Sequence, residues 1–220
     1  IEVQNCNNEI SKNSIKKLDN SKPQVIKVVL NNYRKWQKNN IRILTERSRI
    51  IPAKYKKRFN AKIEVTFQDN LRCTFNARIR AHGDFKDHIY LDNGAVVQSL
   101  DVHLKNGHIN GITKFKLFIP ETRGKASHEI FITELLREFN FIAPRTSFVD
   151  VKINEKITTM LFQEKAAKEL LEYNLRREGP LLEGDERYMF PAISKFPDNR
   201  LSNMSIGMLP AIEEAVQVQL

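Results

Sequence analysis

The sequence is poor in several residue types that define whole classes of protein. Its 2 cysteines, Cys6 and Cys73, lie far apart, so we expect neither a disulfide framework nor a zinc motif, and cysteine usage does not set the compartment. With 8 glycines and 8 prolines in 220 residues, a collagen-like, repetitive or disordered chain is excluded. Because no run of about 18 apolar residues occurs, the sequence predicts no membrane-spanning helix.

Acidic residues are also fewer than basic residues. The chain has 36 Lys+Arg against 26 Asp+Glu, a formal net charge of +10. Such a balance favours anionic partners, namely nucleotides, nucleic acid, acidic polymers or membrane surfaces, without choosing among them. Hydrophobic residues make up 41% of the chain, which is enough to bury a core.

Hydrophobic periodicity predicts three β-hairpins and three helices. The apolar residues of 23–38 fall at helical spacing, which predicts an amphipathic helix with a basic outer face. From Ala61 to Ile79 the period changes to two, with a polar turn at 68–70, and this predicts a first hairpin. The segments "VVQSLDVHLK" and "ITKFKLFI" form a second hairpin across "NGHING", with Lys114 and Lys116 on the face away from the aliphatic residues.

The second half of the chain begins with a helix. "KASHEIFITELLREFNF" carries an apolar stripe at helical spacing, with Ser127 as its N-cap and Pro144 beyond its end. "TSFVDVKIN" and "KITTMLFQE" are a third pair of strands across a short turn. "KAAKELLEYNLRRE" returns to helical spacing, and a weak helical pattern occurs near "LPAIEEAVQVQL". The fold class expected is therefore α+β, an antiparallel sheet with one inserted helix and an N-terminal helical extension.

This succession resembles the small lobe of a protein kinase, and more specifically the spore-coat protein H (CotH) kinase-like family of atypical bacterial kinases. The resemblance rests on "RIRAHGD" (78–84), "TKFKLFIP" (113–120) and "TTMLFQEKAAKELLEYNLRREG" (158–179). It implies a polar leader and helix over 1–50, a small lobe and hinge helix over 51–180, and the start of an incomplete large lobe over 181–220. It also implies a bacterial protein outside the cytoplasm or at the cell surface.

The stretch "ARIRAHGDFKDHI" concentrates polar residues after a strand, and three interpretations apply to it. A metal site would use imidazole and carboxylate ligands, but the spacing matches no ligand motif, and we expect no metal there. A phosphate site would use Arg80, backbone amides at Gly83 and the ammonium of Lys86. The third interpretation is a solvated charged turn without chemistry.

The family resemblance implies roles for residues on the strands and on the inserted helix. A cleft-facing lysine, Lys116 or alternatively Lys114, would neutralise nucleotide phosphates, and a helix glutamate would hold it. We prefer Lys116 with Glu134 over the alternative partner Glu129. The other interpretation of the two lysines is a solvated face of a sheet.

The hinge of such a lobe would lie at Gln163–Lys165, where the backbone would meet an adenine edge, and Glu164 would match the glutamate of the family's hinge. The other interpretation is that Glu164 and Lys165 form the first turn of a helix. A kinase also needs a catalytic aspartate and carboxylates for Mg²⁺. After the hinge helix only Asp185 and Asp198 occur, in no kinase motif, so the catalytic residue stays unassigned.

The expected function is that of an atypical kinase-like protein that binds ATP with Mg²⁺ for phosphoryl transfer to a protein or glycan acceptor. The transfer itself is expected to be incomplete in this chain. Two alternatives are a pseudokinase scaffold and a non-catalytic basic module that binds an anionic polymer, either nucleic acid or polysaccharide. The basic stretch Lys54–Arg58 supports the polymer, although only Tyr55 and Phe59 could stack on bases.

Overall fold

A computed structural model describes residues 22–68, 70–124, 127–154, 156–179 and 181. The chain divides into two units, Ile1–Asn174 and Leu175–Leu220, and every helix and strand that the structure describes lies in the first. The strands are β1 Pro23–Leu30, β2 Phe59–Phe67, β3 Arg72–Ala81, β4 Ile89–Asp92, β5 Ala95–Gln98, β6 Leu100–Leu104, β7 Lys114–Phe118, β8 Thr146–Ile153 and β9 Lys156–Glu164. The helices are α2 Tyr33–Thr45, α3 Ser127–Glu138 and α4 Lys168–Tyr173, with 3₁₀ turns η1 Ala53–Tyr55, η2 Lys86–His88 and η3 Pro120–Arg123.

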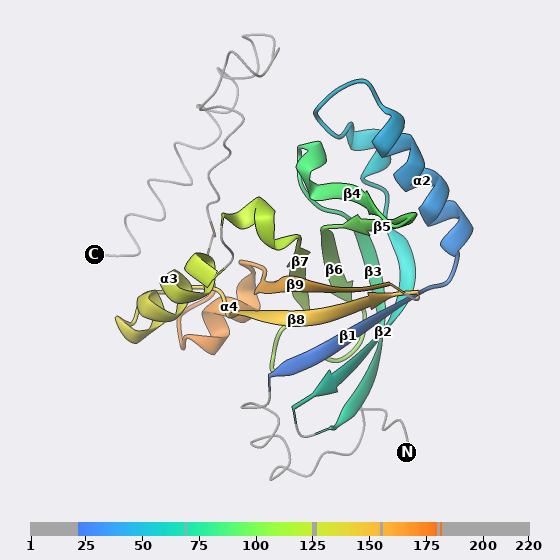
Figure 1. The fold of residues 1–220 in the computed structure, drawn as a ribbon. Coiled ribbons are helices and arrows are strands. Elements are labelled where there is room, and N and C mark those ends of the chain that lie inside the picture. The colour runs from blue at the N-terminus through green and yellow to red at the C-terminus, as the bar shows by residue number, and fades with distance from the viewer. Residues whose placement is uncertain (1–21, 69, 125–126, 155, 180, 182–220) are drawn as a thin grey trace. The chain divides into compact units, whose positions relative to one another are not determined.

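Seven of the strands form a closed barrel in the order β1-β2-β3-β6-β7-β9-β8 (Figure 1). All neighbouring pairs are antiparallel except β1 and β8, which run parallel and close the barrel. The expected α+β kinase small lobe is therefore wrong, because its open sheet is replaced here by a barrel. Closure pairs strands that lie far apart in sequence and leaves no exposed edge.

The first barrel strand was expected to be a helix, and this expectation is wrong. In Pro23–Leu30, Ile26, Val28 and Leu30 point into the barrel, whereas Lys27 is outside and pairs with Glu64. The apolar residues of this stretch fit both a period of two and a helical period. Its β-branched side chains and the flanking strands β2 and β8 decide for the strand. The helix begins only at Tyr33, after Asn32 accepts a hydrogen bond from the amide of Lys35.

The three long hairpins and α3 are confirmed. β2 pairs with β3, β6 with β7, and β8 with β9, each in the expected antiparallel sense. A short second sheet, β4-β5, was not expected, because the turn at Asn93-Gly94 was not recognised. The final helix, α4, covers only Lys168–Tyr173 of the stretch expected to be helical. The weak helical pattern near residues 209–220 lies outside the described residues.

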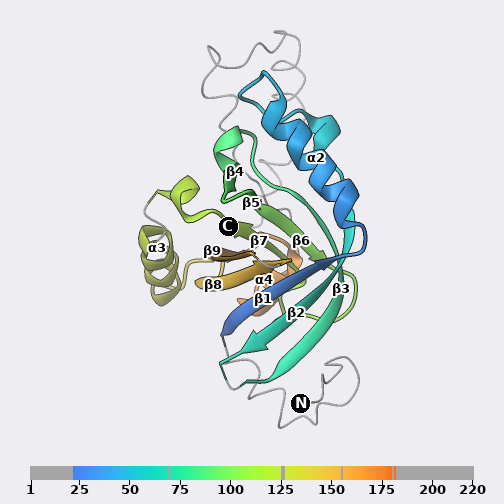
Figure 2. The ribbon, with the colours of Figure 1, turned by 45° about the vertical axis from the view of Figure 1, so that its right-hand side comes forward.

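The barrel interior is the main hydrophobic core. It is filled by alternate residues of each strand, including Ile63, Val65, Phe75, Ile79, Val102, Phe115, Leu117 and Phe162. Because side chains alternate across a strand, the residues between them point outward. Figure 2 shows α2 beside the β4-β5 sheet and α3 outside the barrel near β8 and β9. Arg80 on β3 and Lys114 and Lys116 on β7 therefore lie on the outer face of the barrel.

Cys73, on β3, is disulfide-bonded and buried. The expectation of no disulfide is therefore wrong. The sequence has one other cysteine, Cys6, which lies outside the described residues. Separation along the chain was a poor guide, because a disulfide requires proximity in space and not in sequence.

Candidate functional site

A row of polar side chains crosses the outer face of four neighbouring strands. The register pairs Arg80 of β3 with Asp101 of β6, and Asp101 with Lys116 of β7. It continues from Lys116 to Gln163 of β9. Residues that pair across strands share a face, so the four side chains stand side by side outside the barrel. We call Arg80, Asp101, Lys116 and Gln163 the first row.

Asp101 is the centre of the first row. Its carboxylate accepts hydrogen bonds from Nε and Nη2 of Arg80, at 2.9 and 2.7 Å, and Arg58 Nη2 lies 3.8 Å away. Only 2% of the residue is exposed. Burial alone would raise the pKa of Asp101, but the hydrogen bonds and charge of Arg80, with the charges of Lys165 and Arg58, lower it overall. Asp101 is therefore ionised and fixes the guanidinium of Arg80.

A buried aromatic ring, Phe118, forms the wall beside the first row. The imidazole of His82 meets it edge-on, with ring centroids 4.9 Å apart. Lys116 Nζ lies 5.8 Å from its centroid and the guanidinium carbon of Arg123 lies 4.9 Å from it. Lys116 and Arg123 thus both make cation–π contacts with the ring of Phe118, whose π electrons attract positive charge.

His82 reports the electrostatic character of this wall. Its pKa is lowered from 6.5 to about 3, first by burial and then by the positive charge of Lys116. His88 and Lys56 lower it further, and Asp101 opposes them. His82 is therefore neutral at neutral pH, and burial together with the charge of Lys116 keeps it so.

On the α3 side, Glu129 is the carboxylate that reaches the first row. It accepts hydrogen bonds from Gln163 Nε2 at 2.6 Å and from Arg123 Nη2 at 3.0 Å. Glu134, the preferred partner of Lys116 from the sequence, instead accepts a hydrogen bond from Arg137 on its own helix. The structure therefore places the alternative, Glu129, and not Glu134, beside Gln163.

The loop after β3 is built around Gly83. Its φ of +95° lies in the left-handed region, and a Cβ there would come within 2.0 Å of the His88 ring. Glycine is thus required by both backbone conformation and packing. Lys86, expected to meet phosphate, points elsewhere: its ammonium donates to the carbonyls of Leu44 and Glu46 after α2. Gly83 therefore allows the loop to pack against the His88 ring, whereas Lys86 holds the loop to the C-terminal end of α2.

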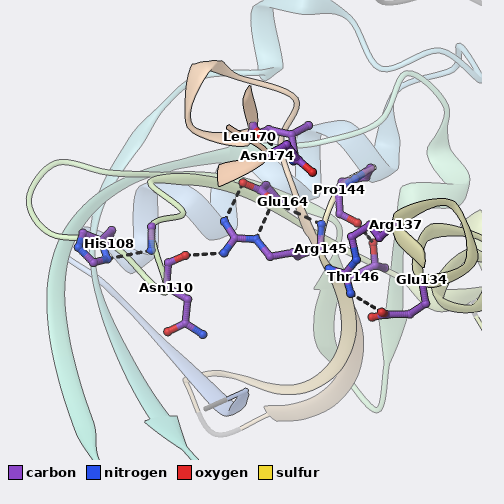
Figure 3. Close-up of polar contacts among 11 residues, drawn as sticks. His108, Asn110, Glu134, Arg137, Pro144, Arg145, Thr146, Glu164, Leu170 and Asn174 are labelled. Carbon is purple, nitrogen blue, oxygen red and sulfur yellow. Dashed lines mark hydrogen bonds and ion pairs between the residues drawn. The ribbon is translucent and has the colours of Figure 1, made fainter. Parts of the chain in front are cut away.

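Glu164 belongs to a different structure from the rest of the predicted hinge. It pairs with Phe115, an inward residue, and is held by Arg145 (Figure 3). Arg145 Nε and Nη2 donate to its two carboxylate oxygens, both at 2.9 Å, and Nη1 donates to the carbonyl of Asn110 at 2.5 Å. The guanidinium also stacks 3.9 Å from the ring centroid of Tyr173. This clamp ties β8, β9, α4 and the loop before β7 together, which is a structural role.

The last predicted residue, Lys114, lies on a second row and not on the first. It pairs with His103 in register, and its ammonium lies 3.9 Å from a carboxylate oxygen of Glu169. The two lysines between which the sequence could not choose are thus two residues apart on one face. Lys116 is the one beside Asp101.

Sequence reasoning did not identify Asp101 and Arg123, and it considered His82 only as a metal ligand and Arg58 only as part of a basic stretch for a polymer. A signal for Asp101 was present, because "LDVHL" alternates and places Asp101 and His103 on the polar face of a strand. Arg123 and Arg58 come from segments outside the strands, and no periodicity locates such residues. Their position depends on the barrel as a whole.

The donor set around the first row does not fit a Mg²⁺ site. Asp101 is engaged by Arg80 and Arg58, and Glu129 by Arg123 and Gln163. Mg²⁺ is bound by carboxylates and water in nearly ideal octahedral geometry, and these oxygens already accept from cations or amides. Among the described residues, no three His, Cys, Asp or Glu side chains gather as metal ligands.

Comparison with known proteins gave no family assignment. No family model matches the chain, and no curated protein matches it. The resemblance to the CotH kinase-like family therefore stays a prediction. Within the described parts of the chain, none of the helices has the length and apolar character needed to cross a membrane.

Proposed function

We propose that this protein binds the phosphate groups of a nucleotide on the outer face of the barrel, at the first row. The observation that supports the proposal is the side-by-side register of Arg80, Asp101 and Lys116 on three adjacent strands. Arginine presents a planar fork that matches two phosphate oxygens, and lysine adds a point charge. Spacing of about 4.8 Å between strands lets both cations reach one phosphate chain.

The charges of the site favour an anion despite the central carboxylate. Arg80 and Arg58 lie against the single charge of Asp101, and the charge of Lys116 acts on the neighbouring His82, so these side chains carry three positive charges and one negative charge. Asp101 also holds Arg80 in one orientation, which lowers the entropy lost when a ligand binds. The pKa of His82 is lowered first by burial and then by the positive charge of Lys116, so this cation acts on the imidazole beside the first row.

The proposal retains part of what the CotH-like resemblance implies. Arg80 and Lys116, both expected at the phosphates, stand two strands apart in one row, and α3 supplies a carboxylate nearby through Glu129. Phosphoryl transfer is not part of the proposal, because the two carboxylates at the first row, Asp101 and Glu129, already accept hydrogen bonds from cationic or amide groups. The nucleotide-binding function is therefore proposed without catalysis.

The disulfide of Cys73 bears on the compartment in which this binding occurs. Disulfides persist in oxidising compartments such as the periplasm and the cell exterior, and are rare in the cytosol. We therefore place the protein in an oxidising compartment, in agreement with the location that the resemblance implies. A nucleotide or another phosphate ester present there would be the ligand.

Calorimetric titration with Mg-ATP and with inorganic tripolyphosphate tests the proposal. The unaltered chain is expected to bind both, because the proposal assigns the affinity to the phosphates. Lys116→Gln is expected to weaken both affinities by about tenfold or more, since a hydrogen bond to a charged group contributes about 1.5–3 kcal/mol. Arg80→Gln is a second test, read together with its melting temperature because it leaves Asp101 with one partner fewer.

The matched control is Lys38→Gln, which removes the same charge from the exposed face of α2. It should leave both affinities within about twofold, because exposed charges more than a Debye length of about 10 Å apart are largely screened. Equal affinities for the Lys116→Gln variant and the unaltered chain would refute the proposed site. Equal losses in both variants would show that only the net charge matters.

A further inference from the structure

A second row of cations lies beside the first on the same outer face. Its register runs from Asn60 of β2 to Arg78 of β3, then to His103 of β6 and Lys114 of β7. Rows on one face of a sheet are two residues apart along each strand, which is about 6.6–6.8 Å. Arg78 and Lys114 are separated by two strand spacings, or about 10 Å. We call Asn60, Arg78, His103 and Lys114 the second row.

The second row is accessible and is enlarged by the loop after β6. Arg78 and Lys105 are exposed, and Lys105 Nζ donates to Asn60 Oδ1 at 3.1 Å, so its ammonium lies at the row. A carboxylate oxygen of Glu169 lies 3.9 Å from Lys114 Nζ and forms an ion pair with it. The pKa of His103 is lowered, first by burial and then by the charges of Lys114 and Arg58, against Asp101 and Glu169. Arg78, Lys105 and Lys114 thus give this row three cations, with Glu169 beside Lys114.

We propose that the second row binds an acidic polysaccharide, whose carboxylates pair with Arg78, Lys105 and Lys114. An extended polyanion can follow the row across β3, β6 and β7, because its cations are spread over about 10 Å and not gathered in one pocket. This inference goes beyond nucleotide binding, since none of these three cations belongs to the first row. The row and the polysaccharide match because their charges are opposite and because both are extended.

Two observations favour a polysaccharide over nucleic acid. Among the outward positions of β2, β3, β6 and β7, Phe118 is the one Phe, Tyr or Trp, and it is only 2% exposed. The described face thus presents the imidazole of His103 but no exposed Phe, Tyr or Trp, the large rings on which the bases of single-stranded nucleic acid commonly stack. The disulfide of Cys73 indicates an oxidising compartment, where cell-surface polysaccharides occur.

The test is fluorescence anisotropy with labelled oligogalacturonate, at low salt, on the chain described here. The double variant Arg78→Gln/Lys114→Gln is expected to weaken binding by about tenfold or more, because it removes two charge-assisted contacts. The control Lys35→Gln/Lys38→Gln removes two charges from exposed positions of α2 and should change the affinity by no more than about twofold. Circular dichroism melts establish that both variants fold.

The outcomes separate this inference from the proposed nucleotide site. The second-row double variant should lose much less affinity for Mg-ATP than Lys116→Gln does, because Arg80 and Lys116 are intact and only the longer-range attraction of the removed charges is lost. Loss of oligogalacturonate binding in both double variants alike would overturn the inference, since binding would then follow net charge. Equal or tighter binding of a DNA duplex or a single strand, measured in the same buffer, would also overturn it.

Discussion

Replacing Glu164 with glutamine is expected to lower the free energy of unfolding by about 3–5 kcal/mol. Glu164 is 2% exposed, and its carboxylate neutralises the guanidinium of Arg145 through two hydrogen bonds of 2.9 Å. Removing one partner of a buried ion pair leaves the other charge uncompensated, and such changes cost about this much. The effect is large because Arg145 also joins the loop at Asn110 and the ring of Tyr173 to the end of the barrel.

Urea unfolding followed by circular dichroism measures this effect. The control is Glu172→Gln on α4, where the carboxylate pairs with Lys168 at 3.6 Å and both side chains are more than half exposed. An exposed pair at i,i+4 contributes about 0.3–0.5 kcal/mol, so the control should be nearly neutral. If Glu164→Gln changed stability no more than Glu172→Gln does, the clamp would not have the structural role assigned to it.

Replacing His82 with glutamine is expected to flatten the acid limb of the stability curve. The pKa of His82 is about 3 in the folded protein and near 6.5 when unfolded. Between these values the unfolded chain binds one more proton than the folded chain, so stability falls as pH falls from about 6.5 toward 3. The slope attributable to one such proton is about 1.4 kcal/mol per pH unit.

The measurement is urea unfolding at pH values from 7 to 4, on the unaltered chain and on the His82→Gln variant. As pH falls, the free energy of unfolding of the unaltered chain minus that of the variant is expected to decrease by at most about 1.4 kcal/mol per pH unit. His103, whose pKa is also lowered, is present in both proteins and cancels in the comparison, whereas His88 interacts with His82 and its own titration changes with the substitution. Parallel curves for the two proteins would show that neither burial nor the charge of Lys116 lowers the pKa of His82 in the folded protein.

Much of the strand pattern could be predicted from the sequence, whereas closure of the barrel could not. The hairpins 59–81, 100–118 and 146–164 follow from alternating side chains and short polar turns. Closure depends on the parallel pairing of β1 with β8, whose residues Val25 and Asp150 are far apart in sequence. No local periodicity encodes such a pairing, and Pro23–Leu30 also fits a helix. An open kinase-like sheet was expected because that one strand was assigned to a helix.

The candidate site was predictable to the extent that it lies on strands. Alternation placed Arg80 and Lys116 on outward faces, and register in the barrel brings both beside Asp101. Pattern alone could not choose between Glu129 and Glu134, since both fit the polar side of α3. It also could not show that Glu164 points inward, because the apolar run "MLF" before it hides the alternation. Such residues depend on how elements pack, which is a property of the tertiary structure.

The central claim, that phosphates bind at the first row, is tested most directly by the pKa of His82 measured by NMR without and with tripolyphosphate. Lys116 lowers this pKa, so an anion bound at Lys116 and Arg80 must raise it. We expect the imidazole resonances of His82 to titrate at higher pH when tripolyphosphate is present, with His108, on the loop before β7, as an internal reference. An unchanged pKa of His82 at saturating tripolyphosphate would contradict the account.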